Sequence, residues 1–214
     1  MNTEAKKSKT GKTIFALVLG GLAGFFAAMG MMQLVESGTL GDLSASREVA
    51  LLVALIYGLT AAAVLVGLLN PAIGAKFLNV EDAEELREQR GMLGWSGAAM
   101  LCWAGTLAVL ALGGEGFPIP SVTAAAIVGG LMLVSILATA KQWHLTDELM
   151  RALSRESTAL AFYLLAGIGG GWAALAHLDL VSGPAMLDWL TMAAAFILIA
   201  VFWKAGRRGM LEMR

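Results

Sequence analysis

Six apolar runs in the chain are each long enough to cross a lipid bilayer. They cover residues 14–34, 49–69, 92–112, 122–140, 158–176 and 186–203. A helix needs about 20 apolar residues to cross the hydrocarbon core. Only helices and closed barrels satisfy their backbone hydrogen bonds in lipid, and these runs lack the period-two alternation of barrel strands. The sequence therefore predicts an all-α, polytopic integral membrane protein built as a bundle of six transmembrane helices.

The overall composition agrees with this prediction. Hydrophobic residues make up 58% of the chain and charged residues 14%, whereas charged residues make up about a quarter of an ordinary soluble domain. The formal net charge of −1 argues against a nucleic-acid partner, because such partners require a basic surface. The expected partner of most of this surface is the lipid bilayer.

The distribution of basic residues predicts the orientation of the bundle. With six spans, all but one of the 15 Lys and Arg residues fall on the side that holds both termini. The positive-inside rule places that side in the cytoplasm. We therefore expect basic cytoplasmic tails at residues 1–13 and 204–214, a membrane domain at 14–203, and a multi-pass location in a bacterial inner (plasma) membrane. The single exception is Arg47, which is predicted to lie outside.

Two loops on the predicted inner side carry the same short charged pattern. Glu84-Glu85-Leu86-Arg87 precedes the third span, and Glu148-Leu149-Met150-Arg151 precedes the fifth. A Glu and an Arg three residues apart lie on one face of a helix and can form an ion pair. Glu84, Glu85, Arg87, Glu148 and Arg151 are therefore candidate residues for contact with a membrane or cytoplasmic protein partner. The alternative interpretations are that both loops are simply solvated helical linkers, or that they mark a diverged repeat of two helical hairpins.

Local patterns suggest how these loops and helices are arranged. Thr146 is the expected N-cap of the helix that includes Glu148, and Trp143 is an expected anchor at the inner membrane interface. Gly20-x-x-x-Gly24 and Gly167-x-x-x-Gly171 have the small-residue spacing that brings helices close together. The expected role of both glycine pairs is packing inside the bundle.

The central parts of the six runs contain no Asp, Glu, Lys, Arg or His. Ionisable residues at this depth usually mark ion pathways or coupling sites, so a proton-coupled pump or antiporter lacks its usual signature. We expect the polar residues within the spans to form hydrogen bonds between helices or to their own backbone; these residues are Gln33, Thr60, Thr106, Ser135, Thr139 and Thr191.

The sequence shows no pattern typical of a catalytic centre, a cofactor site or a metal site. The densest acidic set lies in the two charged loops: Glu81, Asp82, Glu84, Glu85, Glu88, Asp147, Glu148 and Glu156. Facing carboxylates bind divalent metal ions in some helical bundles, but those sites usually include a Glu-x-x-His pair, which is missing here. A solvated charged surface is the expected role of this set.

Three classes of function remain open. The first is a non-enzymatic accessory, assembly or regulatory component that acts through its charged cytoplasmic loops, which the absence of buried chemistry favours. The second is a small permease or lipid-handling protein for an uncharged or amphipathic molecule. The third is a membrane enzyme with an acidic site on its cytoplasmic face.

Overall fold

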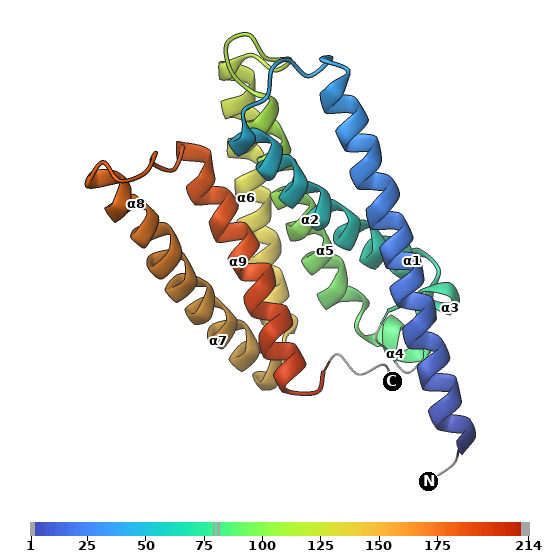
Figure 1. The fold of residues 1–214 in the computed structure, drawn as a ribbon. Coiled ribbons are helices and arrows are strands. Elements are labelled where there is room, and N and C mark those ends of the chain that lie inside the picture. Colours follow the sequence, from blue (N-terminus) through green and yellow to red (C-terminus); the bar gives the residue numbers. More distant parts are fainter. Residues whose placement is uncertain (1–2, 79, 81, 211–214) are drawn as a thin grey trace.

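The computed structural model describes residues 3–78, 80 and 82–210, and the side chains of Ile14 and of the described residues from Val18 onward. Its long helices are α1 (Thr3–Glu36), α2 (Ala45–Leu69), α5 (Arg90–Leu112), α6 (Ser121–Leu145), α7 (Glu148–Leu164) and α9 (Met186–Arg207). Shorter helices are α3 (Pro71–Gly74), α4 (Ala83–Glu88) and α8 (Gly170–His177), and a π-helical turn, η1 (Leu165–Gly169), joins α7 to α8. Figure 1 shows the long helices side by side, with α1 beginning and α9 ending at the same end of the bundle.

Six helices in the described chain are long and apolar enough to cross a membrane. They coincide with the six predicted runs, so the prediction of an all-helical bundle with six candidate spans is confirmed. Most are longer than predicted. The fifth span extends from Glu148 to His177 as α7, η1 and α8 together, about 45 Å at 1.5 Å per residue. That length exceeds the roughly 30 Å of a hydrocarbon core, so the first turns of α7 extend beyond it.

The centre of the bundle is formed by α2, α5 and α9. Their principal buried cluster joins Val53, Ala54 and Tyr57 to Leu107 and Ala194. Small residues predominate at these contacts, which lets the helix axes approach closely, as is usual between helices in lipid. The Tyr57 hydroxyl donates a hydrogen bond to the carbonyl oxygen of Ala194 at 2.9 Å, and this bond ties α2 to α9.

The outer helices are attached to this centre in two separate pairs. Helix α6 packs on α5, whereas α7 packs on α9. Helix α1 lies at the edge of the bundle, where α2 is its main neighbour (Figure 1). A Cβ atom added at Gly20 or at Gly24 would meet nothing within 4 Å. The expectation that this glycine pair mediates packing inside the bundle is therefore wrong, because both residues face away from the other helices.

The second predicted glycine pair also fails to pack as expected. Added Cβ atoms at Gly167 and Gly171 would meet nothing within 4 Å. Gly169, which lies between them, is the buried one, and its added Cβ would lie 3.1 Å from the Trp189 ring. The π-helical turn at Leu165–Gly169 inserts an extra residue into the helix and shifts the face presented to α9.

Helix α2 ends where the sequence indicates. Asn70 terminates α2, and Pro71 begins α3 in the first-turn position that proline tolerates. The chain then folds back so closely that a Cβ added at Gly74 would lie 2.5 Å from the carbonyl oxygen of Gly67. Leu86 of α4 is fully buried against the same turn. This fold-back places the first charged loop directly beneath α2 and α5.

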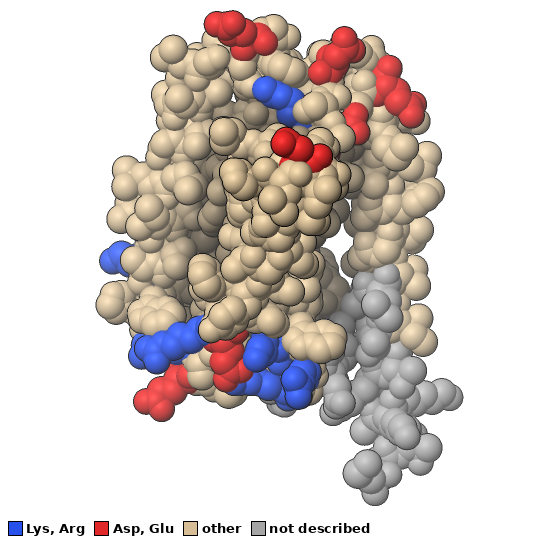
Figure 2. Space-filling view, turned by 60° about the vertical axis from the view of Figure 1, so that its left-hand side comes forward, with Lys and Arg blue, Asp and Glu red and all other residues tan. Residues whose placement is uncertain are grey.

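Basic residues gather toward one end of the molecule, whereas acidic residues lie at both ends. Figure 2 shows Lys and Arg gathered mainly at one end and Asp and Glu prominent at the other. We call the end at which α1 begins and α9 ends the basic end; its described basic residues are Lys76, Arg87, Arg90, Lys141, Arg151, Arg155, Lys204, Arg207 and Arg208. The opposite, acidic end carries Glu36, Asp42, Glu48, Glu115, Asp179 and Asp188.

Arg47 is the basic residue of the acidic end, and it is held within the fold. Its guanidinium donates hydrogen bonds to the carbonyl oxygens of Ala111 at 2.5 Å and Gly113 at 2.9 Å. The same group lies 3.7 Å from the centre of the Phe117 ring. The last carbonyl groups of a helix have no partner within the helix. Arg47 therefore caps the C-terminus of α5, which explains a cation on the side where the charge pattern predicts few.

Candidate functional site

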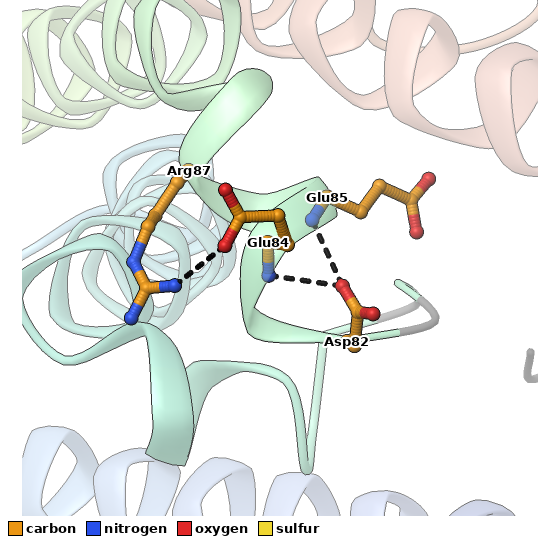
Figure 3. Close-up of polar contacts among 4 residues, drawn as sticks. All are labelled: Asp82, Glu84, Glu85 and Arg87. Atoms are coloured by element: carbon orange, nitrogen blue, oxygen red, sulfur yellow. Dashed lines mark hydrogen bonds and ion pairs between the residues drawn. The ribbon is translucent and has the colours of Figure 1, made fainter.

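The first charged loop forms a short separate helix at the basic end (Figure 3). Asp82 is the N-cap of α4, and its carboxylate accepts hydrogen bonds from the backbone N–H groups of Glu84 and Glu85, each at 2.9 Å. The predicted ion pair between Glu84 and Arg87 is confirmed at 2.9 Å, with both side chains more than half exposed. The loop does not extend α5, because α4 ends at Glu88 and α5 begins at Arg90. Glu81 lies outside the described residues.

The second charged loop is built differently. Asp147, not Thr146, caps α7, because its carboxylate accepts a hydrogen bond from the backbone N–H of Met150 at 2.7 Å. The Thr146 hydroxyl instead donates to the Gln142 carbonyl oxygen. The predicted pair of Glu148 with Arg151 is not among the ion pairs of the described residues.

Arg151 turns toward Trp143 at the end of α6. Its guanidinium donates to the backbone oxygen of Trp143 at 3.2 Å and lies 5.8 Å from the centre of the indole ring. Arg155, one turn further along α7, lies 5.7 Å from the same ring. Cations at this distance from an aromatic face are attracted by its quadrupole. Trp143 thus lies beside two arginines, in addition to being exposed at the basic end as an interface anchor would be.

The two charged loops belong to different parts of the bundle. Helix α4 packs on α3 and α5, whereas α7 packs on α9. The five candidate residues therefore do not form one continuous packed surface. The two proposed hairpins also differ, because α2 packs against α5 while α6 and α7 each pack on another helix. The structure gives no support to a repeat of one hairpin unit.

A cavity of about 360 Å³ lies at the basic end where α5, α6, α7 and α9 come together. We call it the α7 cavity. Its polar lining includes Ser96, Gln142, Ser154, Ser157, Thr158 and Tyr57. Its apolar lining includes Met92, Met100, Met150, Leu153 and Leu198. This size and mixture are typical of a small-molecule site, and methionine side chains adapt to occupants of different shape.

One polar group that lines this cavity lacks a hydrogen-bond partner within the described chain. Ser157 is 1% exposed, and its hydroxyl has no partner. The buried Nε of Arg151, which lies beside the lining residue Trp143, also has none. Buried polar groups are nearly always hydrogen-bonded. The Ser157 hydroxyl is an exception to this rule, and it lies in the lining of the α7 cavity.

An apolar groove continues from the cavity toward the middle of the bundle. This α6 groove has a volume of about 440 Å³ and includes Trp103, Met132 and Ile136 among its lining residues. Thr139 and Trp143 line both the groove and the cavity. Because α6 runs from the acidic end to the basic end, the groove extends from the basic end toward mid-span. A cavity of mixed polar and apolar lining therefore adjoins an apolar groove.

An ion-pair network closes α7 onto α9 at the edge of this cavity. Glu156 of α7 lies 2.7 Å from the guanidinium of Arg208 and 3.7 Å from the ammonium of Lys204. Glu156 is thereby neutralised. Within the described residues, no group of three or more His, Cys, Asp or Glu side chains is arranged to hold a metal ion. Of the carboxylates in the two loops, Asp82 and Asp147 cap helices, and Glu84 and Glu156 form ion pairs.

The polar residues inside the spans differ in their contacts. The hydroxyls of Thr60 and Thr191 donate to the carbonyl oxygens of Ile56 and Leu187 in their own helices, as expected. Thr106 is buried and has no hydrogen-bond partner among the described residues, so that expectation is wrong for it. Thr139 lines the α7 cavity.

The residues of α7 that line the cavity are not among the candidate residues expected from the sequence. The signal was present in the periodicity of residues 148–158. Leu153, Ser157 and Ala161 are the buried residues of α7, while Ser154 and Thr158 line the cavity beside them. Such an amphipathic pattern is typical of a helix at a membrane interface.

Comparison with known proteins finds no matching family model, no matching curated protein and no matching solved structure. The functional assignment therefore depends on the residues and geometry of this chain.

Proposed function

We propose that the protein binds an amphipathic molecule in the α7 cavity and α6 groove, as a lipid-handling protein or a small permease would. The observation that carries this proposal is the unpartnered, buried hydroxyl of Ser157 in a cavity that continues into an apolar groove. An amphipathic occupant would give Ser157 a hydrogen bond and place an apolar chain along α6.

The membrane location and orientation belong to the same proposal. The bias of Lys and Arg toward the basic end supports a bacterial inner membrane with both termini in the cytoplasm. In that orientation the α7 cavity lies at the cytoplasmic interface. Cysteines introduced at Glu115 and at Gly209 check the orientation in intact spheroplasts, where an impermeant maleimide should label the first and not the second.

The proposed binding predicts that purified protein retains lipid and that filling the cavity removes it. Ser157→Leu introduces a larger apolar side chain and removes the unpaired hydroxyl. We expect this variant to lose most of the lipid that the wild type carries through a mild-detergent purification, as counted by native mass spectrometry. Thr60→Leu is the matched control, because Thr60 bonds its own helix and does not line the cavity. Wild-type protein without bound lipid, or equal retention by both variants, would refute the proposal.

A second candidate is a non-enzymatic accessory or regulatory component that contacts a protein partner through its charged loops. The exposed Glu84–Arg87 pair on a short helix of its own supports it. The two loops lie on different helix pairs, so they do not form one contact surface. We therefore propose that α4 alone contacts the protein partner. This candidate fails if Glu84→Ala combined with Arg87→Ala leaves every co-purifying protein in place.

The membrane-enzyme candidate has less support. Asp82 and Asp147 act as helix caps, Glu84 pairs with Arg87, and Glu156 pairs with α9. Each of these four carboxylates therefore already has a cap or ion-pair contact within the described chain.

A further inference from the structure

Two arginines whose charge no carboxylate neutralises within the described chain lie beside Trp143, a residue that lines the α7 cavity. Arg151 and Arg155 form none of the ion pairs of the described residues. Glu156, the residue next to Arg155, is engaged by Arg208 and Lys204 of α9 instead. Both arginines lie over the Trp143 ring, which itself lines the cavity.

Contacts with Trp143 set the orientation of the Arg151 guanidinium. The Arg151 guanidinium uses one nitrogen to hold the Trp143 backbone oxygen, and its buried Nε has no hydrogen-bond partner. A guanidinium binds phosphate through two parallel N–H groups. The Ser157 hydroxyl lines the α7 cavity, whereas the Arg151 Nε–H lies beside Trp143 at its edge.

Neighbouring charges favour a negative occupant. Asp147 and Glu148 are the acidic residues at the start of α7, and Asp147 is already used as its cap. The surrounding basic residues are Lys141, Arg151 and Arg155, together with Lys204, Arg207 and Arg208 at the end of α9. The basic residues outnumber the acidic ones, including Glu156, at this edge of the bundle.

We propose that the site selects an anionic phospholipid whose phosphate lies beside Arg151 and Arg155 and whose acyl chain follows the α6 groove. This inference rests on the proposed lipid-binding function and adds the class of headgroup. The proposed ligand is a membrane lipid and not a soluble phosphate, because Trp143, which lies beside both arginines, also lines the apolar α6 groove.

The test is a competition experiment on full-length protein, read by native mass spectrometry. Delipidated protein is offered an equal mixture of phosphatidylglycerol and phosphatidylcholine of matched chains. We expect the wild type to prefer phosphatidylglycerol by roughly 25-fold, since each of the two arginines near an anionic lipid contributes about fivefold. Arg151→Gln combined with Arg155→Gln should abolish the preference while leaving lipid bound.

The control removes the same charge from the same end of the bundle. Arg87→Gln combined with Arg90→Gln should keep the lipid preference, because neither residue lies over Trp143 or lines the cavity. Excess inorganic phosphate should not displace the lipid. An equal loss in both double variants, or no preference in the wild type, would overturn the headgroup inference while lipid binding itself stands. Displacement by inorganic phosphate would show a soluble anion site instead. Absence of any bound lipid would overturn the proposed function.

Discussion

Replacing Arg47 by Met should cause the largest loss of stability of any single change to a charged residue in the described chain. The substitution keeps much of the apolar stem and removes the hydrogen bonds to carbonyl groups at and just after the end of α5. We expect a loss of about 3 kcal/mol in the free energy of unfolding, as for hydrogen bonds that involve a charged group. The contact with Phe117 is lost as well. Thermal unfolding in a mild detergent measures the effect.

Two controls make this prediction specific. Arg47→Lys keeps the charge but replaces a planar fork by a point donor, so it should give an intermediate loss. Arg90→Met removes an exposed basic residue at the other end of α5 and should leave the melting temperature nearly unchanged. Equal melting temperatures for Arg47→Met and Arg90→Met would show that the Arg47 cap contributes nothing to stability.

Gly74→Ala should also destabilise the protein strongly, although it adds a single methyl group. The new Cβ would lie 2.5 Å from the Gly67 carbonyl oxygen, 2.7 Å from a methyl carbon of Leu86 and 2.8 Å from the Gly67 Cα. Two of these atoms are backbone, so the turn between α2 and α3 must shift. Overpacking of this kind costs roughly 1–3 kcal/mol. Thermal unfolding in the same mild detergent measures this loss of stability.

Gly58→Ala is the matched control for this steric argument. Gly58 also lies in the bundle, but the nearest atom to its added Cβ is the Ala104 methyl at 3.8 Å, an ordinary van der Waals contact. Alanine forms helix more readily than glycine, so this variant should be as stable as the wild type or slightly more so. If Gly74→Ala unfolds at the same temperature as Gly58→Ala, the close approach of α3 to α2 is not present in the protein.

The sequence alone predicts the features that depend on local patterns. The apolar runs locate six candidate spans, Asn70-Pro71 locates the end of α2, and the spacing of Glu84 and Arg87 predicts their ion pair. Each follows from neighbours in the chain. The hydrogen bonds of Thr60 and Thr191 to their own helices are predictable for the same reason.

Features that depend on which face of a helix meets another helix are not predictable in this chain. Lipid is as apolar as a leucine side chain, so a span that is apolar all round does not reveal its packing face. This is why Gly20 and Gly24 were expected inside and lie outside. Arg151 shows a related limit: its ion pair with Glu148 was sterically possible, but Trp143, brought close by the turn after α6, provides the contact instead.

The candidate site could not be predicted from the sequence for the same reason. Ser157 and Trp143 are 14 positions apart in the sequence, and only the packing of α7 on α9, with α6 on α5, brings both to one cavity. No single-helix pattern places Tyr57 of α2 in the same lining. The amphipathic start of α7 was the available signal, and it indicates an interface position without identifying a cavity.

The most direct test of the central claim is to locate the bound lipid on the chain. A phospholipid with a photoactivatable group near its headgroup is incorporated with the full-length protein into nanodiscs, irradiated, and mapped by peptide mass spectrometry. Our account predicts cross-links concentrated at Gln142–Trp143 and Met150–Thr158, and their loss in Ser157→Leu. Cross-links spread evenly around the basic ends of all the spans, and unchanged in that variant, would contradict it.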